Sequence, residues 1–95
     1  MATNVGVLHL TMSVPGANSL KDKRRQVKGF KDRLSNRFNV SVAEVGSLEV
    51  YRTAELAVAM VGNDRRYIEG ALQQIINAAA SHREMILVEE QIEWM

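Results

Sequence analysis

Side chains alternate with a period of two along three separate stretches of the chain. In the first, Leu8, Leu10 and Met12 are separated by polar residues, a period of two that is typical of a strand with one buried face. The same period recurs twice further along, with Val40 and Val42 on one side of the second stretch. We therefore predict three strands, at about residues 5–14, 40–43 and 56–61.

A fourth apolar pattern, near the end of the sequence, is less regular. Four apolar residues share one parity there, and Glu90 interrupts them. Such an interruption is typical of a β-bulge or of a strand at the edge of a sheet. We predict a last strand whose inward residues are Ile86, Val88, Ile92 and Trp94.

Two other stretches have the period of a helix. Apolar residues at positions 20, 27, 30, 34 and 38 fall on one face, which predicts a helix over about residues 20–37. Ser19 is its expected N-cap, with Asp22 three residues later as a weak capping box. The second helix starts after Asn63 and Asp64, because both residue types favour the N-cap position. Its apolar face consists of Ile68, Ala71, Leu72, Ile75, Ile76 and Ala79.

The predicted order is strand, helix, strand, strand, helix, strand. Two split βαβ units in this order close into a ferredoxin-like sandwich of the α+β class. Right-handed crossovers leave few other topologies. We therefore expect one domain over residues 1–95, with a four-stranded antiparallel sheet and both helices on one of its faces.

Composition removes several classes of protein. The chain has 95 residues and no cysteine, which excludes disulfides, iron–sulfur clusters and cysteine-based zinc sites. Its longest run rich in apolar residues, 56–61, is far shorter than the roughly 20 residues that cross a bilayer. The N-terminus lacks a basic segment followed by an apolar one, as a secretory signal would have. We expect a cytoplasmic protein with no membrane partner and no cofactor.

The net charge of +1 conceals an uneven distribution. Residues 1–48 hold eight Lys or Arg and three Asp or Glu, a balance of +5, whereas residues 49–95 hold four and eight, a balance of −4. In the predicted fold, the start of the first helix meets the 46–53 turn and the 81–84 loop at one end. His82 and six cations belong to these segments: Lys21, Lys23, Arg24, Arg25, Arg52 and Arg83.

The first helix opens on cations, against the usual preference. A helix N-terminus carries about half a positive charge and favours Asp or Glu, so cations there cost stability. Departures from a local rule are expected at functional sites. Free N–H groups with added cations suit a phosphate or another anion. The competing interpretation is that the long side chains cover the rim of the core and their charges confer solubility.

Five of the cations share one flank of this helix at helical spacing, where they are able to follow a phosphate backbone: Lys21, Arg24, Arg25, Lys28 and Lys31. Lys23, Arg33 and Arg37 fall on the other flank. With the two loop arginines, the candidate set for binding nucleic acid or another anion is Lys21, Lys23, Arg24, Arg25, Lys28, Lys31, Arg52 and Arg83.

Known motifs point away from base stacking and from catalysis. The first and third strands carry no Phe, Tyr or Trp, the residues on which single-stranded RNA stacks in similar folds. No two glycines are three apart, which excludes a GxxG clamp, a dinucleotide fingerprint and a P-loop. His9 and His82 belong to no metal or catalytic pattern. We therefore expect a protein that is not an enzyme and has no metal site.

The sheet face turned away from the helices is a second candidate surface. It is expected to be mildly apolar, with small side chains, and such patches often mark self-association or a partner surface. An uncovered face in a monomer is the other interpretation. The expected residues are Val5, Val7, Val45, Ala57, Ala59 and Val61, with His9, Thr11, Ser41 and Ala43.

Residues 19–45, SLKDKRRQVKGFKDRLSNRFNVSVAEV, resemble the YlxP-like family of small bacterial proteins, a domain of unknown function. The opening VGVLHLTMSVPGANS and the later AVAMVGND agree with the same pattern. The resemblance implies a bacterial cytosolic protein with a ferredoxin-like fold. Genes of this family are often found among those for transcription and translation factors, which implies a ribosome or RNA setting. The resemblance implies no catalytic residues.

Three functional hypotheses follow. The first is a non-enzymatic RNA- or ribosome-associated protein that holds phosphates through its basic helix and adjoining loops. The second is a protein-interaction module or homodimer that uses the open sheet face. The third is a small phosphorylated ligand bound where the start of the first helix meets the 46–53 turn and the 81–84 loop.

Overall fold

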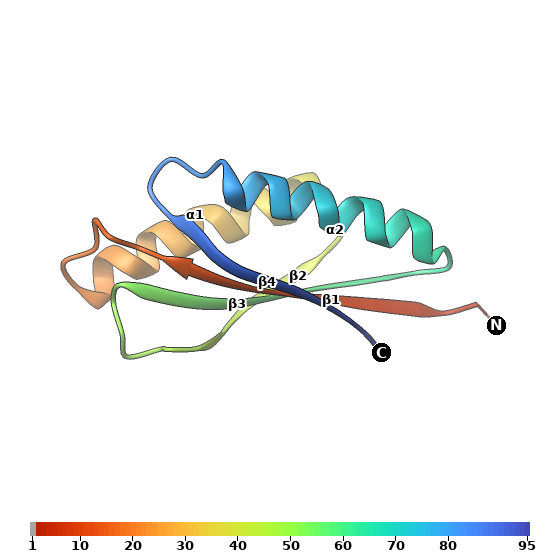
Figure 1. Cartoon of the computed structure of the whole chain (residues 1–95), viewed down its shortest axis with the longest axis horizontal. Helices are drawn as coiled ribbons and strands as arrows, with labels where there is room; N and C mark the ends of the chain where they lie inside the picture. Colours follow the sequence, from red (N-terminus) through yellow and green to blue (C-terminus); the bar gives the residue numbers. More distant parts are fainter. Residues whose placement is uncertain (1) are drawn as a thin grey trace.

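The computed structural model describes residues 2–95. Its elements are β1 (Asn4–Ser13), α1 (Leu20–Arg37), β2 (Ser41–Gly46), β3 (Thr53–Gly62), α2 (Arg65–Ala80) and β4 (Ile86–Trp94). The sheet order is β2-β3-β1-β4, and every neighbouring pair is antiparallel. Figure 1 shows both helices lying over one face of this sheet. The predicted α+β, ferredoxin-like architecture is confirmed.

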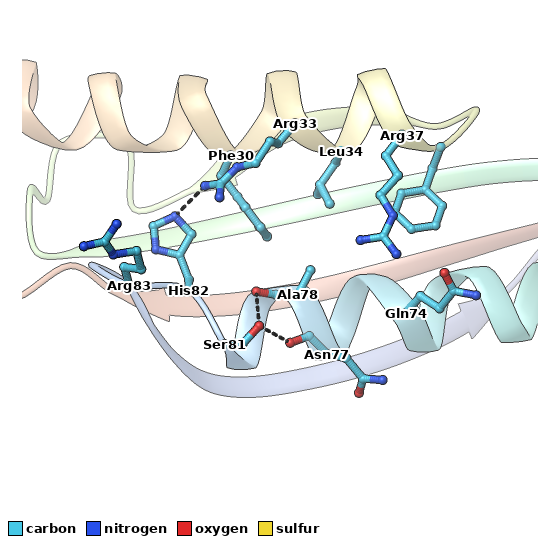
Figure 2. A pocket seen from close by; sticks show the side chains of 11 residues that line it. Phe30, Arg33, Leu34, Arg37, Gln74, Asn77, Ala78, Ser81, His82 and Arg83 are labelled. Carbon is cyan, nitrogen blue, oxygen red and sulfur yellow. Dashed lines mark hydrogen bonds between the residues drawn. The ribbon is translucent and has the colours of Figure 1, made fainter.

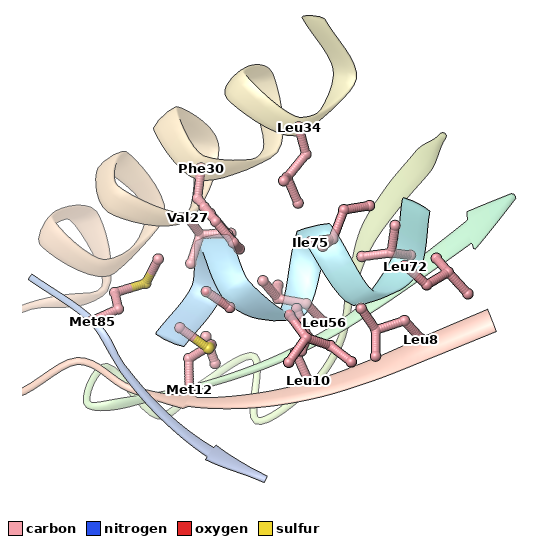
Figure 3. Packing of buried hydrophobic residues seen from close by; sticks show 14 of the residues in the cluster. Leu8, Leu10, Met12, Val27, Phe30, Leu34, Leu56, Leu72, Ile75 and Met85 are labelled. Atoms are coloured by element: carbon pink, nitrogen blue, oxygen red, sulfur yellow. The ribbon is translucent and has the colours of Figure 1, made fainter. Parts of the chain in front are cut away.

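The core fills the space between the sheet and the two helices. Every second residue of β1 from Gly6 to Met12 is buried, as the period of two predicts. Each fully buried Leu, Ile, Val, Phe or Met contributes about 1.5–3 kcal/mol. Side chains from β1, β3, α1, α2 and the 81–85 loop meet in one cluster (Figure 3), including Leu8, Leu10, Met12, Val27, Phe30, Leu34, Leu56, Leu72, Ile75 and Met85.

A glycine allows α2 to approach β1 closely. A Cβ on Gly6 would stand 3.0 Å from Ile68 Cγ2 and from Leu72 Cδ1, and 3.1 Å from the ring of Trp94. These distances are shorter than normal packing contacts. Gly6 therefore sets how closely the second helix lies on the sheet.

Both helix N-termini are capped where the sequence predicts. Ser19 Oγ accepts from the backbone N–H of Asp22, and Asp64 Oδ1 accepts from the N–H groups of Arg66 and Tyr67. The Asp22 carboxylate accepts from the N–H of Asn18, one residue before the expected partner in a capping box. The first helix thus keeps one acidic residue in its first turn despite its many cations.

The last strand differs from the prediction in its first half. The register between β1 and β4 shifts between Thr11 and Met12, so the expected bulge is present, and β4 is an edge strand. Leu87 pairs with Met12 and packs against the core, whereas Ile86 and Val88 are 57% and 63% exposed. Placing these two residues inward was wrong, because the bulge changes which parity faces the helices.

No helix within residues 2–95 has the length and hydropathy that a bilayer crossing requires.

Candidate anion and nucleic-acid interface

Three chain segments meet at one end of the sheet, as the topology predicts. Ser13 pairs with Thr53 on one side and with Ile86 on the other, so β1 ends where β3 and β4 begin. The start of α1 and the loops at 47–52 and 81–85 are consequently grouped at the left of Figure 1. We call this the basic end, because Arg25, Arg52 and Arg83 are exposed there.

Lys23 does not belong to the anion-binding set. Its side chain is fully buried, and its Nζ lies 2.7 Å from Glu44 Oε2. The same Nζ donates to the backbone carbonyls of Ser47 and Thr53, at 2.8 and 3.2 Å. An ammonium group has three N–H donors; this one gives two of them to backbone carbonyls, and its charge is paired with the Glu44 carboxylate. Lys23 is therefore a structural residue that ties α1 to the β2–β3 loop, and phosphate cannot reach it.

The β2–β3 loop is further constrained beside this ion pair. Ser47 has a φ of 54°, the left-handed region that is uncommon for residues other than glycine. Its Oγ donates to Glu55 Oε2 at 2.6 Å, and the Glu55 side chain covers Gly46, where a Cβ would stand 2.5 Å from it. The loop that carries Arg52 is thus held by side chains from three elements.

Of the five cations predicted on one flank of α1, Arg25 lines a hollow beside the 81–85 loop, and the other four form what we call the outer flank: Lys21, Arg24, Lys28 and Lys31. At 100° per residue they lie on one side of the helix, and none of them lines the space between α1 and α2. Lys31 is half-buried and the other three are exposed. Lys28 Nζ donates to Asp32 Oδ2 at 2.8 Å, and this hydrogen bond and the nearby charge raise the pKa of Lys28.

The remaining candidates lie at the basic end. Arg52 Nε donates to the carbonyl of Ala17 at 3.1 Å, which fixes the side chain but leaves the other four N–H donors of the guanidinium unused by that bond. Arg25 lines a hollow of about 440 Å³ between α1 and the 81–85 loop. Asp22 and Glu84 line the same hollow, so this end carries both signs of charge.

A larger groove, of about 450 Å³, lies between the two helices (Figure 2). It is lined by Phe30, Arg33, Leu34, Arg37, Phe38, Gln74, Asn77, Ala78, Ser81, His82 and Arg83. Among these described lining residues three are arginines and none is acidic. Arg33 and Arg37 extend from α1 toward α2 in Figure 2, and the Arg37 guanidinium lies 5.1 Å from the ring of Phe38.

His82 connects the groove to the basic end. Its Nδ1 accepts from the backbone N–H groups of Glu84 and Met85, both at 3.0 Å, and its ring packs edge-on against Phe30. Arg33 Nη2 lies 3.1 Å from its Nε2. Partial burial and the charge of Arg33 lower the pKa of His82 below 6.5, while Glu84 acts in the opposite direction.

Sequence reasoning left Arg33 and Arg37 out of the candidate set. They are four residues apart, so they share a flank of α1. In a fold with two helices on one face of a sheet, the flank opposite the outer cations is the one that faces the other helix. The spacing of Arg33 and Arg37, combined with this topology, would have indicated that both residues face the second helix.

The open sheet face has the expected composition. Val5 lies opposite Val61, and Val7 lies opposite Ala59, so these side chains share one face. Val61 is 58% exposed and Val45 on β2 is 56% exposed. Toward β4 the face becomes polar, where His9 contacts Glu93 at 3.2 Å.

Residues 2–95 contain no group of three or more His, Cys, Asp or Glu arranged to hold a metal ion.

Comparison with known proteins identifies the family. The family model described as "Protein of unknown function (DUF503)" matches residues 5–92. "Uncharacterized protein YlxP" of Bacillus subtilis (strain 168) is 29% identical over 90 residues, which cover 95% of this chain and 98% of that protein. The resemblance seen in residues 19–45 is confirmed. The chain belongs to the DUF503 family of proteins of unknown function.

Proposed function

We propose that this protein is a non-enzymatic RNA- or ribosome-associated protein of the bacterial cytoplasm. It holds phosphates through exposed cations of α1 and the adjoining loops. The observation that carries this proposal is the outer flank. Its four cations share one side of α1, and the one acidic partner found for them within residues 2–95 is Asp32, beside Lys28.

The spacing of the outer flank suits an extended polyanion. Lys21 and Lys31 are ten residues apart, which corresponds to about 15 Å along the helix axis. A strand that follows the helix therefore meets several cations in succession. Arg25 and Arg52, exposed at the basic end, extend the surface beyond the first turn of α1.

This surface contacts phosphates rather than bases. Strands β1 and β3 carry no aromatic residue on which a base could stack. Contacts to phosphates position a nucleic acid but carry no sequence information directly. We therefore expect binding that depends weakly on sequence and strongly on salt.

Charge reversal on the outer flank and the basic end tests the proposal. The affinity of the Arg24→Glu and Arg25→Glu variants for fluorescent single-stranded RNAs of different sequence is measured by anisotropy over a range of salt concentrations. We expect each variant to bind all the RNAs more weakly by a similar factor. The slope of log affinity against log salt should become shallower by about 0.7 for each cation lost.

Arg66→Glu is the matched control. Arg66 is exposed in the first turn of α2, at the other end of the molecule, and its reversal changes the net charge equally. The proposal predicts a much smaller effect for this variant. Equal losses for Arg24→Glu and Arg66→Glu would show that net charge alone attracts RNA, and unchanged affinity of Arg24→Glu at low salt would refute the proposal.

The open sheet face supports a second candidate function, self-association. The exposed side chains of Val45 and Val61 on an otherwise small-residue face are the observation that favours it. Ala57, which pairs with His9 and Ala43, lies on the same face. Ala57→Glu should convert a dimer to a monomer in sedimentation velocity. A native chain that sediments as a monomer at about 100 μM, where contacts with dissociation constants well below that value would form, rules this function out.

A further inference from the structure

The groove between α1 and α2 has the dimensions of a site for one small ligand. Its volume of about 450 Å³ falls within the range of about 300–1,000 Å³ that is typical of small-molecule sites. Phe30 and Leu34 form its buried floor, and the partly exposed Phe38 and Ala78 supply apolar surface, one from each side. Gln74, Asn77 and Ser81 supply amides and a hydroxyl on the α2 side.

Hydrogen bonding at His82 leaves an acceptor missing. A neutral imidazole has one N–H and one lone pair. The lone pair is on Nδ1, because Nδ1 accepts from the N–H groups of Glu84 and Met85. The proton is therefore on Nε2, which lies 3.1 Å from Arg33 Nη2, an atom that can only donate. Two donors face one another, and an anionic oxygen placed beside them would accept from both.

The other cations of the groove favour a doubly charged oxyanion. Arg37 and Arg83 line the same groove as Arg33, and no acidic residue does so within the described chain. Arginine presents a planar fork of donors that matches phosphate oxygens. A single carboxylate would leave most of these donors unused.

The α2 side of the groove suits a ligand that also carries hydroxyl groups. Gln74, Asn77 and Ser81 line the groove there, and all three are exposed. Their amide and hydroxyl groups can donate to and accept from sugar hydroxyls.

We propose that the groove between α1 and α2 binds a nucleoside monophosphate unit, either free or at the phosphorylated end of an RNA strand. Its phosphate accepts from Arg33 and from His82 Nε2–H, with Arg37 and Arg83 at the same groove. Its base packs on the partly exposed side chains of Phe38 and Ala78, and its sugar hydroxyls lie toward Gln74, Asn77 and Ser81. The site does not depend on RNA binding by the outer flank, because no outer-flank cation lines either hollow.

Calorimetric and NMR titrations of the 95-residue chain test this site. The ligands are the four nucleoside monophosphates, inorganic phosphate, adenosine, and two short RNAs that differ only in a 5′-phosphate. We expect saturable binding of at least one nucleoside monophosphate, or of the phosphorylated RNA over its 5′-hydroxyl counterpart. Inorganic phosphate and adenosine should bind more weakly, because each supplies only one part of the ligand.

Matched variants and the His82 ring locate the binding. Arg33→Met should weaken it by about tenfold or more, the loss expected for a charge-assisted hydrogen bond, and Arg33→Lys should retain part of it. Arg66→Met, in the first turn of α2, should leave it unchanged. The ring nitrogens of His82 should show that Nε2–H gains an acceptor while Nδ1 remains unprotonated.

Three results would overturn the proposal. The first is the absence of saturable binding for all four nucleoside monophosphates together with equal affinity for the two RNAs. The second is inorganic phosphate binding as tightly as every nucleoside monophosphate. The third is Arg33→Met keeping full affinity while its unfolding midpoint matches that of the native chain. None of these results depends on whether Arg24→Glu weakens RNA binding.

Discussion

The two flanks of α1 carry the same kind of charge in different surroundings. On the outer flank, the cations contact solvent and one acidic residue of their own helix, Asp32. On the other flank, Arg33 and Arg37 face a groove closed by a second helix and by the loop that carries His82. An open row of charges suits a long polyanion of any sequence, whereas a lined groove suits one compact ligand.

A third cation shows how little charge alone says about role. Lys23 precedes Arg24 in the sequence, yet its ammonium is fully buried and paired with Glu44. Taking such a pair out of water is expensive, and the backbone carbonyls of Ser47 and Thr53 help to offset that cost by accepting from the ammonium. The role of each cation of α1 therefore depends on what its N–H donors contact.

Removing Lys23 should have the largest effect of any cation substitution in α1. Lys23→Met leaves Glu44, whose side chain is 17% exposed, without its partner, and breaking a buried pair in this way costs about 3–5 kcal/mol. For a domain of this size, each kcal/mol lowers the melting temperature by about 4–8 °C. Thermal and urea unfolding measure the loss, with Arg24→Met as the matched control.

The double variant Lys23→Met, Glu44→Leu keeps this prediction testable if the single variant does not fold. Replacing both partners by apolar residues of similar volume is often neutral. We expect the double variant to recover most of the lost stability. Similar stability for Lys23→Met and Arg24→Met would mean that the buried contacts contribute little.

The role of Lys23 was within reach of the sequence. Glu44 shares the parity of Val40 and Val42, so the strand pattern places it on the inward face of β2. Lys23 lies only 40° from Val27 on a helical wheel, within the apolar stripe of α1. A charged residue on each of two facing apolar surfaces indicates a buried pair.

Other features were harder to predict because they depend on register. The order of the elements and the helix caps follow from local sequence patterns. The meeting of three segments at the basic end follows from the topology. The bulge in β4 follows from pairing with β1, and apolar residues at Ile86, Leu87 and Val88 fit either parity. The donor conflict at His82 needs the positions of Arg33 and two backbone N–H groups, which no sequence pattern encodes.

Measuring RNA binding and nucleotide binding for variants of both flanks is the second test of the comparison. Arg24→Glu should reduce the salt slope for 5′-hydroxyl RNA by about 0.7 and leave nucleotide binding intact. Arg33→Glu should reduce nucleotide binding by about tenfold or more and change the RNA slope less. Parallel losses in both assays would mean that α1 presents one continuous anion surface instead of two.

Freeing Lys28 should have a smaller effect, in the opposite direction. Asp32 accepts a hydrogen bond from Lys28 and raises its pKa, so it occupies a cation of the outer flank. Asp32→Asn should strengthen RNA binding by about two- to threefold at low salt and steepen the salt slope by up to about 0.7. Glu69→Gln, which removes an exposed acid from α2, is the control. Equal gains from both variants would point to net charge rather than to the outer flank.

The smallest expected effect is a pH dependence of stability that arises from His82 in the groove. Burial and Arg33 lower the pKa of His82 in the folded state below 6.5, with Glu84 opposing. As the pH falls below 6.5, the unfolded chain takes up a proton on this ring before the folded chain does, so the free energy of unfolding decreases until the folded pKa is passed.

His82→Asn retains an acceptor for the N–H groups of Glu84 and Met85 but cannot titrate. Urea unfolding at about pH 7.5 and about pH 5.5 should show a smaller loss of stability for this variant than for the native chain. His9→Asn removes a histidine from the open sheet face, and an equal reduction for His82→Asn and His9→Asn would contradict the assignment to the groove.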